Sequence, residues 1–307
     1  MKICVLGAGA VGSAVGGLLA NAGHEVALIG RKSHMDAIRA GGLKINGIFG
    51  ASIAHPAVLE TIPDNGYDLI ILTVKSYDTE KAVAELSRHY PDARILNLQN
   101  GIGNYETLEN YFPEESIYSG MIIIGFEIPE DGAVNITVYG GDVMIGRYGR
   151  PQDSFSQEIA EIFNATPIKA KAVDHIESWL WGKLLYNASL NPLGAVLDVP
   201  YGRLLEPAAW SIIRVVLLEI FAVTSAYEIP MLWRTADEYA SALRERLIPA
   251  TALHRSSMLA DLRKGHRTEI DFLNGAVCRM GAEKSVPTPV NQTLVEQIRF
   301  LEAKKDR

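Results

Sequence analysis

The sequence predicts two domains, an α/β domain followed by an all-helical domain. Three observations support this prediction. The chain has 307 residues, more than a single hydrophobic core comfortably accommodates. Short apolar runs alternate with amphipathic segments as far as about residue 170. From Val173 to Ala303, strand patterns are nearly absent and long helical patterns dominate. We therefore expect the domains to comprise residues 1–170 and 171–307.

The first thirty residues are the most informative element of the first domain. An apolar run at 3–6 leads into a glycine-rich turn, an amphipathic segment ending at Asn21, and a second apolar run at 26–29. This is the order of a β-α-β unit, and the turn has the GxGxxG spacing of a dinucleotide fingerprint. Free N–H groups at the start of a helix favour a bound phosphate. The sequence therefore predicts a Rossmann-type dinucleotide-binding domain whose phosphate-binding residues are Gly7, Ala8, Gly9, Ala10, Val11 and Gly12.

The end of the second strand indicates which dinucleotide binds. NAD and FAD sites usually place an Asp or Glu about 20 residues after the glycines. This chain has Gly30, Arg31, Lys32 and Ser33 at that point. Two cations and a hydroxyl suit a 2′-phosphate, which a guanidinium can bind through two parallel hydrogen bonds. We therefore predict NADPH as the cofactor, with Arg31 at the 2′-phosphate. The alternative is that Arg31 and Lys32 belong to an ordinary solvated loop.

The middle of the first domain continues the alternation of strands and helices. A short helix from Asp36 is ended by Gly41 and Gly42, and a small hairpin is expected at 43–45 and 51–53. Continuous apolar runs then precede helical patterns, and such runs fit parallel strands covered on both faces. These strands are expected at 68–75 and 94–101, and their helices at 79–89 and 105–111. Polar residues follow both strands at the carboxyl end, where an open α/β sheet binds its ligand.

The last part of the first domain is rich in β-forming residues. We expect three antiparallel strands that complete the sheet, then a helix and an extended segment. Their residues are 121–126, 133–139, 143–145, 155–164 and 167–172.

Composition and charge narrow the class of protein. The chain is 48% hydrophobic and 21% charged, as in an ordinary globular protein, and its net charge of -7 argues against nucleic-acid binding. Cys4 and Cys278 lack the spacing of a metal or redox site, so no metal is expected and a reducing cytoplasm fits best. No signal peptide is expected. No membrane span is expected either, because no apolar run reaches the roughly 18 residues that one needs.

The second domain carries a polar pattern within an apolar stretch. Lys183, Asn187 and Asn191 recur every four residues, which on a helix places them on one face. One reading is a site with an ammonium and two amides. The other is that Lys183 only extends its stem along apolar surface while an Asn beside Pro192 ends the helix. The pattern alone leaves both readings open.

Five motifs in register along the chain point to a family. They are VLGAGAVGS at the N-terminus, TVKSYDT around Lys75, LQNGIGN around Asn100, WGKLLYNASLNPL around Lys183, and SSMLADLRKGHRTEIDFLNG from Ser256 to Gly275. Together they resemble the ketopantoate reductase family, the NADPH-dependent 2-dehydropantoate 2-reductases. The resemblance implies reduction of 2-dehydropantoate to pantoate, on the route to pantothenate and coenzyme A. It also implies a helical second domain like that of 6-phosphogluconate dehydrogenases, with the active site in the cleft between the domains.

The resemblance also implies roles for residues that bind the ligands. Asn187 and Asn191 match the family's substrate-binding amides, and Ser257 matches its contact to the substrate carboxylate. Lys75 and Asn100, at the ends of two strands, match residues that reach the cofactor. The expected substrate is a small 2-oxo acid.

The catalytic residues implied by the resemblance are Lys183, as general acid, and Glu269, as the carboxyl group that acts with it. An ammonium can stabilise the charge that develops on a carbonyl oxygen and can supply the proton. Burial would lower the pKa of Lys183, and a nearby Glu269 would keep it charged. The alternative for Glu269 is a structural one, in which Thr268 and Asp271 form a capping box and Glu269 favours the helix dipole.

The match to the family weakens at two places. Tyr201 stands where family members commonly carry an asparagine that contacts substrate, so the pocket could be shaped differently. Bulky residues at 120–127 replace small residues and threonines beside the cofactor. Alternatives are therefore a reductase of another 2-oxo or 3-oxo acid, or a non-catalytic NADP(H)-binding sensor. The apolar residues 210–223 fit either a core or the face of a homodimer.

Overall fold

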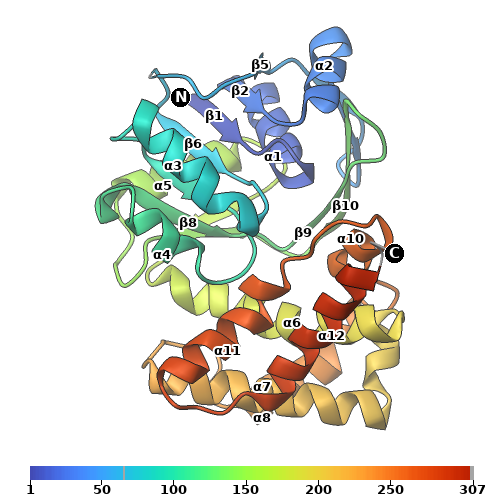
Figure 1. The fold of residues 1–307 in the computed structure, drawn as a ribbon. Helices are drawn as coiled ribbons and strands as arrows, with labels where there is room; N and C mark the ends of the chain where they lie inside the picture. The colour runs from blue at the N-terminus through green and yellow to red at the C-terminus, as the bar shows by residue number, and fades with distance from the viewer. Residues whose placement is uncertain (65, 305–307) are drawn as a thin grey trace. The chain divides into compact units, whose positions relative to one another are not determined.

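The structure, a computed structural model, describes residues 1–64 and 66–304. The chain divides into two compact units (Figure 1). Unit 1 comprises residues 1–99 and 104–176, and unit 2 comprises residues 100–103 together with the chain from residue 177 onward. Unit 1 contains the strands and unit 2 contains helices, so the predicted fold class is confirmed.

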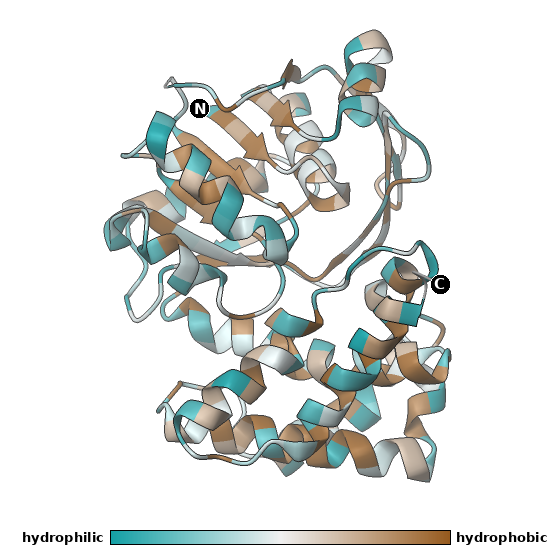
Figure 2. Ribbon diagram, in the orientation of Figure 1, coloured by the Kyte–Doolittle hydropathy of each residue, from teal (hydrophilic) through white to brown (hydrophobic). Residues whose placement is uncertain are grey.

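Unit 1 is built on an eight-stranded sheet. In spatial order the strands are β12 (Ala170–Ala172), β11 (Val143–Gly146), β8 (Ile117–Met121), β7 (Ile95–Asn97), β6 (Leu69–Leu72), β1 (Lys2–Leu6), β2 (Glu25–Ile29) and β5 (Ala57–Leu59). In this order, the neighbouring strands from β8 to β5 are all parallel, and β11 joins β8 antiparallel. The central strands are mostly apolar and are largely brown in Figure 2, as expected of strands that helices cover on both faces.

Helices cover both faces of this sheet. Alternate residues of β1 enter two cores: Ile3 and Val5 pack with α1 and α5, whereas Cys4 and Leu6 pack with α3 and α4. Unit 1 contains α1 (Ala10–Asn21), α2 (Lys32–Gly41), α3 (Thr79–His89), α4 (Asn104–Glu109) and α5 (Ser154–Asn164), with short 3-10 turns at Ser76–Asp78 and Glu114–Ser116. The result is a three-layer, doubly wound arrangement in which ligands are expected at the carboxyl ends of the parallel strands.

A second sheet corrects one sequence prediction. The strands expected to complete the main sheet include β9 (Ile124–Glu127) and β10 (Ala133–Tyr139), but these pair with β3 (Leu43–Gly47) and β4 (Ser52–Ala54). The expected hairpin β3–β4 is present, and β10 adds parallel to β3. The apolar residues of this sheet, such as Ile45 and Ile136, share the core of α1. The small sheet thus covers the outer side of the helix that follows the glycine loop.

The described residues of unit 2 form helices joined by loops and contain no strand. Its elements are α6 (Ile176–Leu197), α7 (Pro207–Ala226), α8 (Ala236–Ala242), α9 (Ile248–Ala250), α10 (Ser257–Arg263), α11 (Asn274–Glu283) and α12 (Pro289–Ala303), with a π-helical turn at Leu243–Leu247 and 3-10 turns at Tyr201–Leu205 and Ile270–Phe272. One large apolar core joins them, and α6 contributes to it along its whole length. Because α6 also carries Lys183, the core fixes the position of the candidate site.

Helix α7 is the element of the described chain that bears on the expectation about membrane spans. It has 20 residues and is long and apolar enough to cross a membrane by those two criteria alone. Half of its most apolar window is buried within the structure, where Ile213, Val216 and Ile220 are fully covered. Ile212, Val215 and Leu218 remain exposed on its other side. Its apolar character is therefore explained largely by its place in the core of unit 2.

Candidate active site

The glycine loop lies between β1 and α1, as the fingerprint predicts. Helix α1 begins after Gly9, which gives it no side-chain cap, and its first turn contains no acid. A Cβ atom at Gly12 would lie 2.4 Å from the carbonyl oxygen of Gly7 and 2.5 Å from Oγ1 of Thr73, so only glycine fits there. A Cβ atom at Gly9 would meet only the carbonyl oxygen of Gly7, at 4.0 Å. A free helix N-terminus with a close, unobstructed backbone fits a pyrophosphate.

Two residues that the sequence did not single out support this loop. Ser13 Oγ donates to the carbonyl oxygen of Ala8 (3.2 Å) and lies 3.0 Å from Nε2 of His34, and both side chains are buried. The backbone N–H of Gly132 donates to Nδ1 of His34, at 3.0 Å, so the proton of the neutral ring is on Nε2. Burial lowers the pKa of His34. The contact joins α1, α2 and the β9–β10 loop, which no local sequence pattern reveals.

Three cationic side chains occupy the carboxyl ends of strands in unit 1. Arg31 and Lys32 follow β2, and Lys75 follows β6 on the other side of β1. Lys32 Nζ is bound to Asp36 at 2.7 Å, whereas Arg31 is exposed and forms no ion pair with another residue in the part of the chain described. Arg31 precedes the first turn of α2. This arrangement leaves the guanidinium, rather than the ammonium of Lys32, available to a phosphate.

Helix α6 presents the polar face that the four-residue spacing predicts. Pro192 lies inside this helix and has no N–H, so the carbonyl of Ala188 loses its usual helical partner. Asn274 Nδ2 donates to that carbonyl at 2.9 Å and also to Oδ1 of Asn291 at 2.9 Å. A buried amide therefore satisfies the interrupted turn, and the helix continues from Lys183 through Asn191.

Lys183, Asn100 and Glu269 form a hydrogen-bonded chain within unit 2. Lys183 Nζ donates to Asn100 Oδ1 at 2.7 Å, and Asn100 Nδ2 donates to Glu269 Oε2 at 3.3 Å. The segment that carries Asn100 is bound to the turn after Glu269, since the N–H of Ile102 donates to the carbonyl of Phe272 at 2.8 Å. A Cβ atom at Gly101 would lie 2.4 Å from the same oxygen. One amide thus connects the ammonium to the carboxylate.

The surroundings of Lys183 set its proton affinity. Burial lowers the pKa of Lys183 to about 8, against the opposing effect of the Glu269 carboxylate. Removal of water disfavours the charged form of an amine, and a nearby negative charge favours it. An amine of this pKa is mostly protonated at neutral pH and can still lose its proton readily. The snorkelling alternative for Lys183 is therefore not what the structure shows.

The predicted substrate residues line one small pocket. It is formed within unit 2 by Asn100, Asn187, Asn191, Ser257, Met258, Asp261, Glu269 and Leu273. Sequence reasoning missed Asp261, although it lies four residues after Ser257 on α10 and so shares its helical face. The capping box considered for Glu269 does not form, because Asp271 is bound to Arg267 and Arg299.

Two expectations about the pocket are resolved by burial. Tyr201, 2% exposed, is not among the residues that line the pocket; its hydroxyl donates to Oδ1 of Asn191 at 2.6 Å. In the 120–127 segment, Ile122 is buried in the core of unit 1, and Ile124 and Phe126 pack against that core. Ile122, Ile124 and Phe126 thus belong to the interior of unit 1, whereas Ile123 is 46% exposed.

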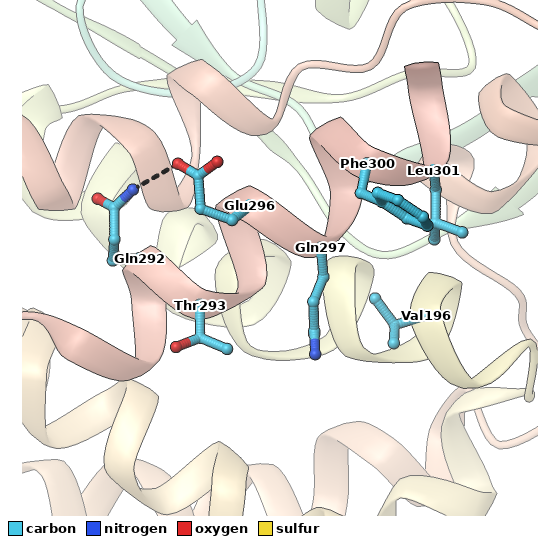
Figure 3. Close-up of a pocket in the computed structure, with 7 residues that line it drawn as sticks. All are labelled: Val196, Gln292, Thr293, Glu296, Gln297, Phe300 and Leu301. Carbon is cyan, nitrogen blue, oxygen red and sulfur yellow. Dashed lines mark hydrogen bonds between the residues drawn. The ribbon is translucent and has the colours of Figure 1, made fainter. Parts of the chain in front are cut away.

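A second pocket of unit 2 has different chemistry. Helix α12 and the end of α6 form it, and its lining residues are Val196, Gln292, Thr293, Glu296, Gln297, Phe300 and Leu301 (Figure 3). Gln292 donates to Glu296 at 2.7 Å, and the lining contains no cation. None of the predicted site residues lines this pocket, so the candidate active site is the pocket lined by Asn100, whose amide oxygen accepts from Lys183 Nζ.

Comparison with known proteins agrees with this site. The chain has a doubly wound unit with a dinucleotide-type glycine loop and a helical unit with a lysine, amides and a carboxylate. This architecture is that of a nicotinamide-dependent oxidoreductase. Residues 3–150 match the family model described as ketopantoate reductase PanE/ApbA, and residues 175–302 match the model of its C-terminal part. The chain belongs to the ketopantoate reductase PanE/ApbA family.

Individual relatives are similar along their whole length. The 2-dehydropantoate 2-reductase of Aquifex aeolicus is 35% identical over 305 residues, which cover 98% of this chain and 97% of the relative. A PanE/ApbA family ketopantoate reductase from Ralstonia eutropha has a TM-score of 0.90 at 32% identity, with full coverage of both chains. D-mandelate dehydrogenase with NADH and anilino(oxo)acetate has a TM-score of 0.91 at 29% identity, again with full coverage of both.

Proposed function

We propose that this protein reduces 2-dehydropantoate to pantoate with NADPH, with Lys183 as the general acid. The observation that carries the proposal is the hydrogen-bonded chain of Lys183, Asn100 and Glu269 beside a pocket lined by amides. Family membership supports the reaction, because the full-length relatives are named 2-dehydropantoate 2-reductases. Such an enzyme would act in the cytoplasm, in the route to pantothenate and coenzyme A.

The cofactor is a nicotinamide dinucleotide, and we propose NADPH in particular. When bound, it supplies the hydride that reduces the ketone. Gly7 to Gly12 would hold the pyrophosphate at the N-terminus of α1, and Lys75 would bind at the adjacent strand end. Arg31, which has no ion-pair partner in the described chain, would bind the 2′-phosphate. The family resemblance and this guanidinium support NADPH, while NADH is bound by one structural neighbour.

Lys183 would act on the ketone oxygen. Its ammonium would stabilise the charge that develops on that oxygen and would transfer a proton to it. Asn100, bound to Lys183 through its oxygen, would orient the ammonium. Glu269 would keep the lysine protonated at neutral pH, since its charge opposes the effect of burial. We therefore assign Asn100 to the catalytic cluster in addition to its expected cofactor contact.

The amides and the serine would orient the oxo acid. Asn187 and Asn191 line the pocket from α6, and Ser257 lies at the first turn of α10 on another side of it. All three offer neutral hydrogen bonds, and Ser257 lies beside the helix N-terminus, where a carboxylate is favoured. The substrate class that fits is a small 2-oxo acid.

A second candidate is a reductase of a different 2-oxo acid. It is favoured by the similarity to D-mandelate dehydrogenase and by Tyr201, which replaces the family's usual asparagine. A panel assay separates the candidates: NADPH or NADH, each with 2-dehydropantoate, 2-oxoisovalerate or phenylglyoxylate, monitored by loss of the reduced nicotinamide absorbance. We expect the highest kcat/KM for 2-dehydropantoate with NADPH. Preference for phenylglyoxylate would favour the second candidate, and tight NADPH binding without turnover would favour a sensor.

A further inference from the structure

Tyr201 is held in one position behind the candidate pocket. Its side chain is 2% exposed, its N–H donates to the carbonyl of His254 at 3.0 Å, and its ring packs edge-on against Tyr186 and His254 at centroid distances of 5.8 and 5.2 Å. A buried aromatic ring with contacts on two sides has little freedom to move. Its hydroxyl therefore points to a fixed place.

That place is the oxygen of the Asn191 amide. Tyr201 Oη donates to Asn191 Oδ1 at 2.6 Å. Burial raises the pKa of Tyr201, so its hydroxyl stays protonated and remains a donor. An amide has one acceptor end and one donor end, so holding its oxygen at the Tyr201 hydroxyl directs its N–H groups away from that hydroxyl.

With its oxygen bound to Tyr201, Asn191 has only its donor end left for a ligand in the pocket that it lines. Asn191 lines the pocket and is 6% exposed, and no residue of the described chain accepts a hydrogen bond from its Nδ2. A nearly buried N–H donor without a partner is costly, and a ligand that accepts from it removes that cost. The pocket thus presents an oriented donor at this point.

We propose that Tyr201 is a positioning residue that locks Asn191 with its N–H groups toward the substrate, and so selects an acceptor oxygen of the oxo acid at that position. The inference rests on the proposed function of the pocket. Where family members commonly have an asparagine that itself contacts substrate, this chain acts through Asn191. A free amide could rotate and present its oxygen, which would repel a carboxylate or a carbonyl oxygen.

The test removes only the hydroxyl, with Tyr201→Phe. Tyr186→Phe is the matched control. Its hydroxyl lies 2.6 Å from Thr251 Oγ1 and forms no hydrogen bond with Asn191 in the described chain, while its ring packs against that of Tyr201. We expect Tyr201→Phe to raise KM for the best oxo acid about tenfold, with kcat within about threefold of the wild type and an unchanged melting temperature within a few degrees. Tyr186→Phe should leave KM unchanged.

The same substitution in an Asn191→Ala background shows whether Tyr201 acts through Asn191. If it does, Tyr201→Phe adds no further increase in KM there. An additional increase in that background, or an unchanged KM in the single variant, overturns the proposal. The wild type, the two single variants and the double variant form a double-mutant cycle, which measures both the effect of Tyr201→Phe and its dependence on Asn191.

A measurement without turnover separates this inference from the proposed function. With 15N-labelled asparagine, the side-chain amide signal of Asn191 is the one missing from the spectrum of Asn191→Ala. We expect Tyr201→Phe to shift this signal and speed its exchange with water, and Tyr186→Phe to leave it in place. If the wild type reduces no oxo acid but the signal responds in this way, the proposed function fails and the positioning role stands. If the signal does not respond, the positioning role fails.

Discussion

Glu269→Gln removes one charge from the catalytic cluster and little else. The Gln side chain has nearly the same size, and its oxygen can still accept the hydrogen bond from Asn100 Nδ2. The carboxylate raises the pKa of Lys183 against the effect of burial, which brings it to about 8. Without that charge, Lys183 should lose its proton at lower pH.

The size of the effect follows from the separation of the two charges. A single amide lies between them, and two unit charges ~6 Å apart interact by about 3 kcal/mol at an effective dielectric constant of about 20. Screening of the partly exposed carboxylate reduces this to roughly 1.4 kcal/mol, or about tenfold in proton affinity. The protonated form is the one that reduces the ketone, so the rate falls as pH rises through the pKa. We expect this fall to move about one pH unit lower in the variant.

The assay is kcat/KM for NADPH-dependent reduction between neutral and alkaline pH. The wild type should lose activity above about pH 8. Glu283→Gln is the control, because that carboxylate is bound to Tyr227 elsewhere in unit 2. The electrostatic reasoning would be refuted if the activity of Glu269→Gln fell at the same pH as that of the wild type, or at a higher pH.

Other predictions concern the cofactor, stability and reactivity. Arg31→Ala should raise KM for NADPH at least about tenfold and leave KM for NADH unchanged. Lys32→Ala should have a smaller effect, because that ammonium is already bound to an aspartate. Equal effects of Arg31→Ala on both cofactors in steady-state kinetics would contradict the 2′-phosphate role. Asn274→Leu orphans the carbonyl of Ala188 and should lower the free energy of unfolding by about 1–3 kcal/mol; urea denaturation measures this, and an unchanged midpoint and slope would contradict it. Cys4, whose pKa burial raises to about 12, should react with a thiol reagent only after unfolding, and labelling at Cys4 in the native protein would contradict this.

Local periodicity predicted much of the fold. The first strand, glycine loop and helix occur where the pattern places them, and α3 spans the predicted residues 79–89. The predicted pairing of β9 and β10 with the main sheet was wrong. Strand pairing depends on contacts distant in sequence, here the contact of β10 with β3. The three-residue β5 was not predicted, since a strand so short has too few residues to show a pattern.

The candidate site was only partly accessible from the sequence. The four-residue spacing predicts the common face of Lys183 and Asn191, because a helix fixes it. The contact of Asn100 with Lys183 spans 83 residues, and that of Asn274 with Ala188 spans 86. Such contacts depend on how segments pack, which no local pattern encodes. The burial of Tyr201 beside Asn191 likewise depends on how segments pack.

The most direct test of the central claim compares the wild type with Lys183→Met in two measurements on each protein, NADPH affinity and turnover of 2-dehydropantoate. Methionine keeps the length of the side chain and removes the ammonium. We expect equal NADPH affinity and a loss of kcat of about 100- to 10,000-fold, the range for a positioned general acid. Undiminished turnover in Lys183→Met would contradict the assignment of Lys183 as the acid.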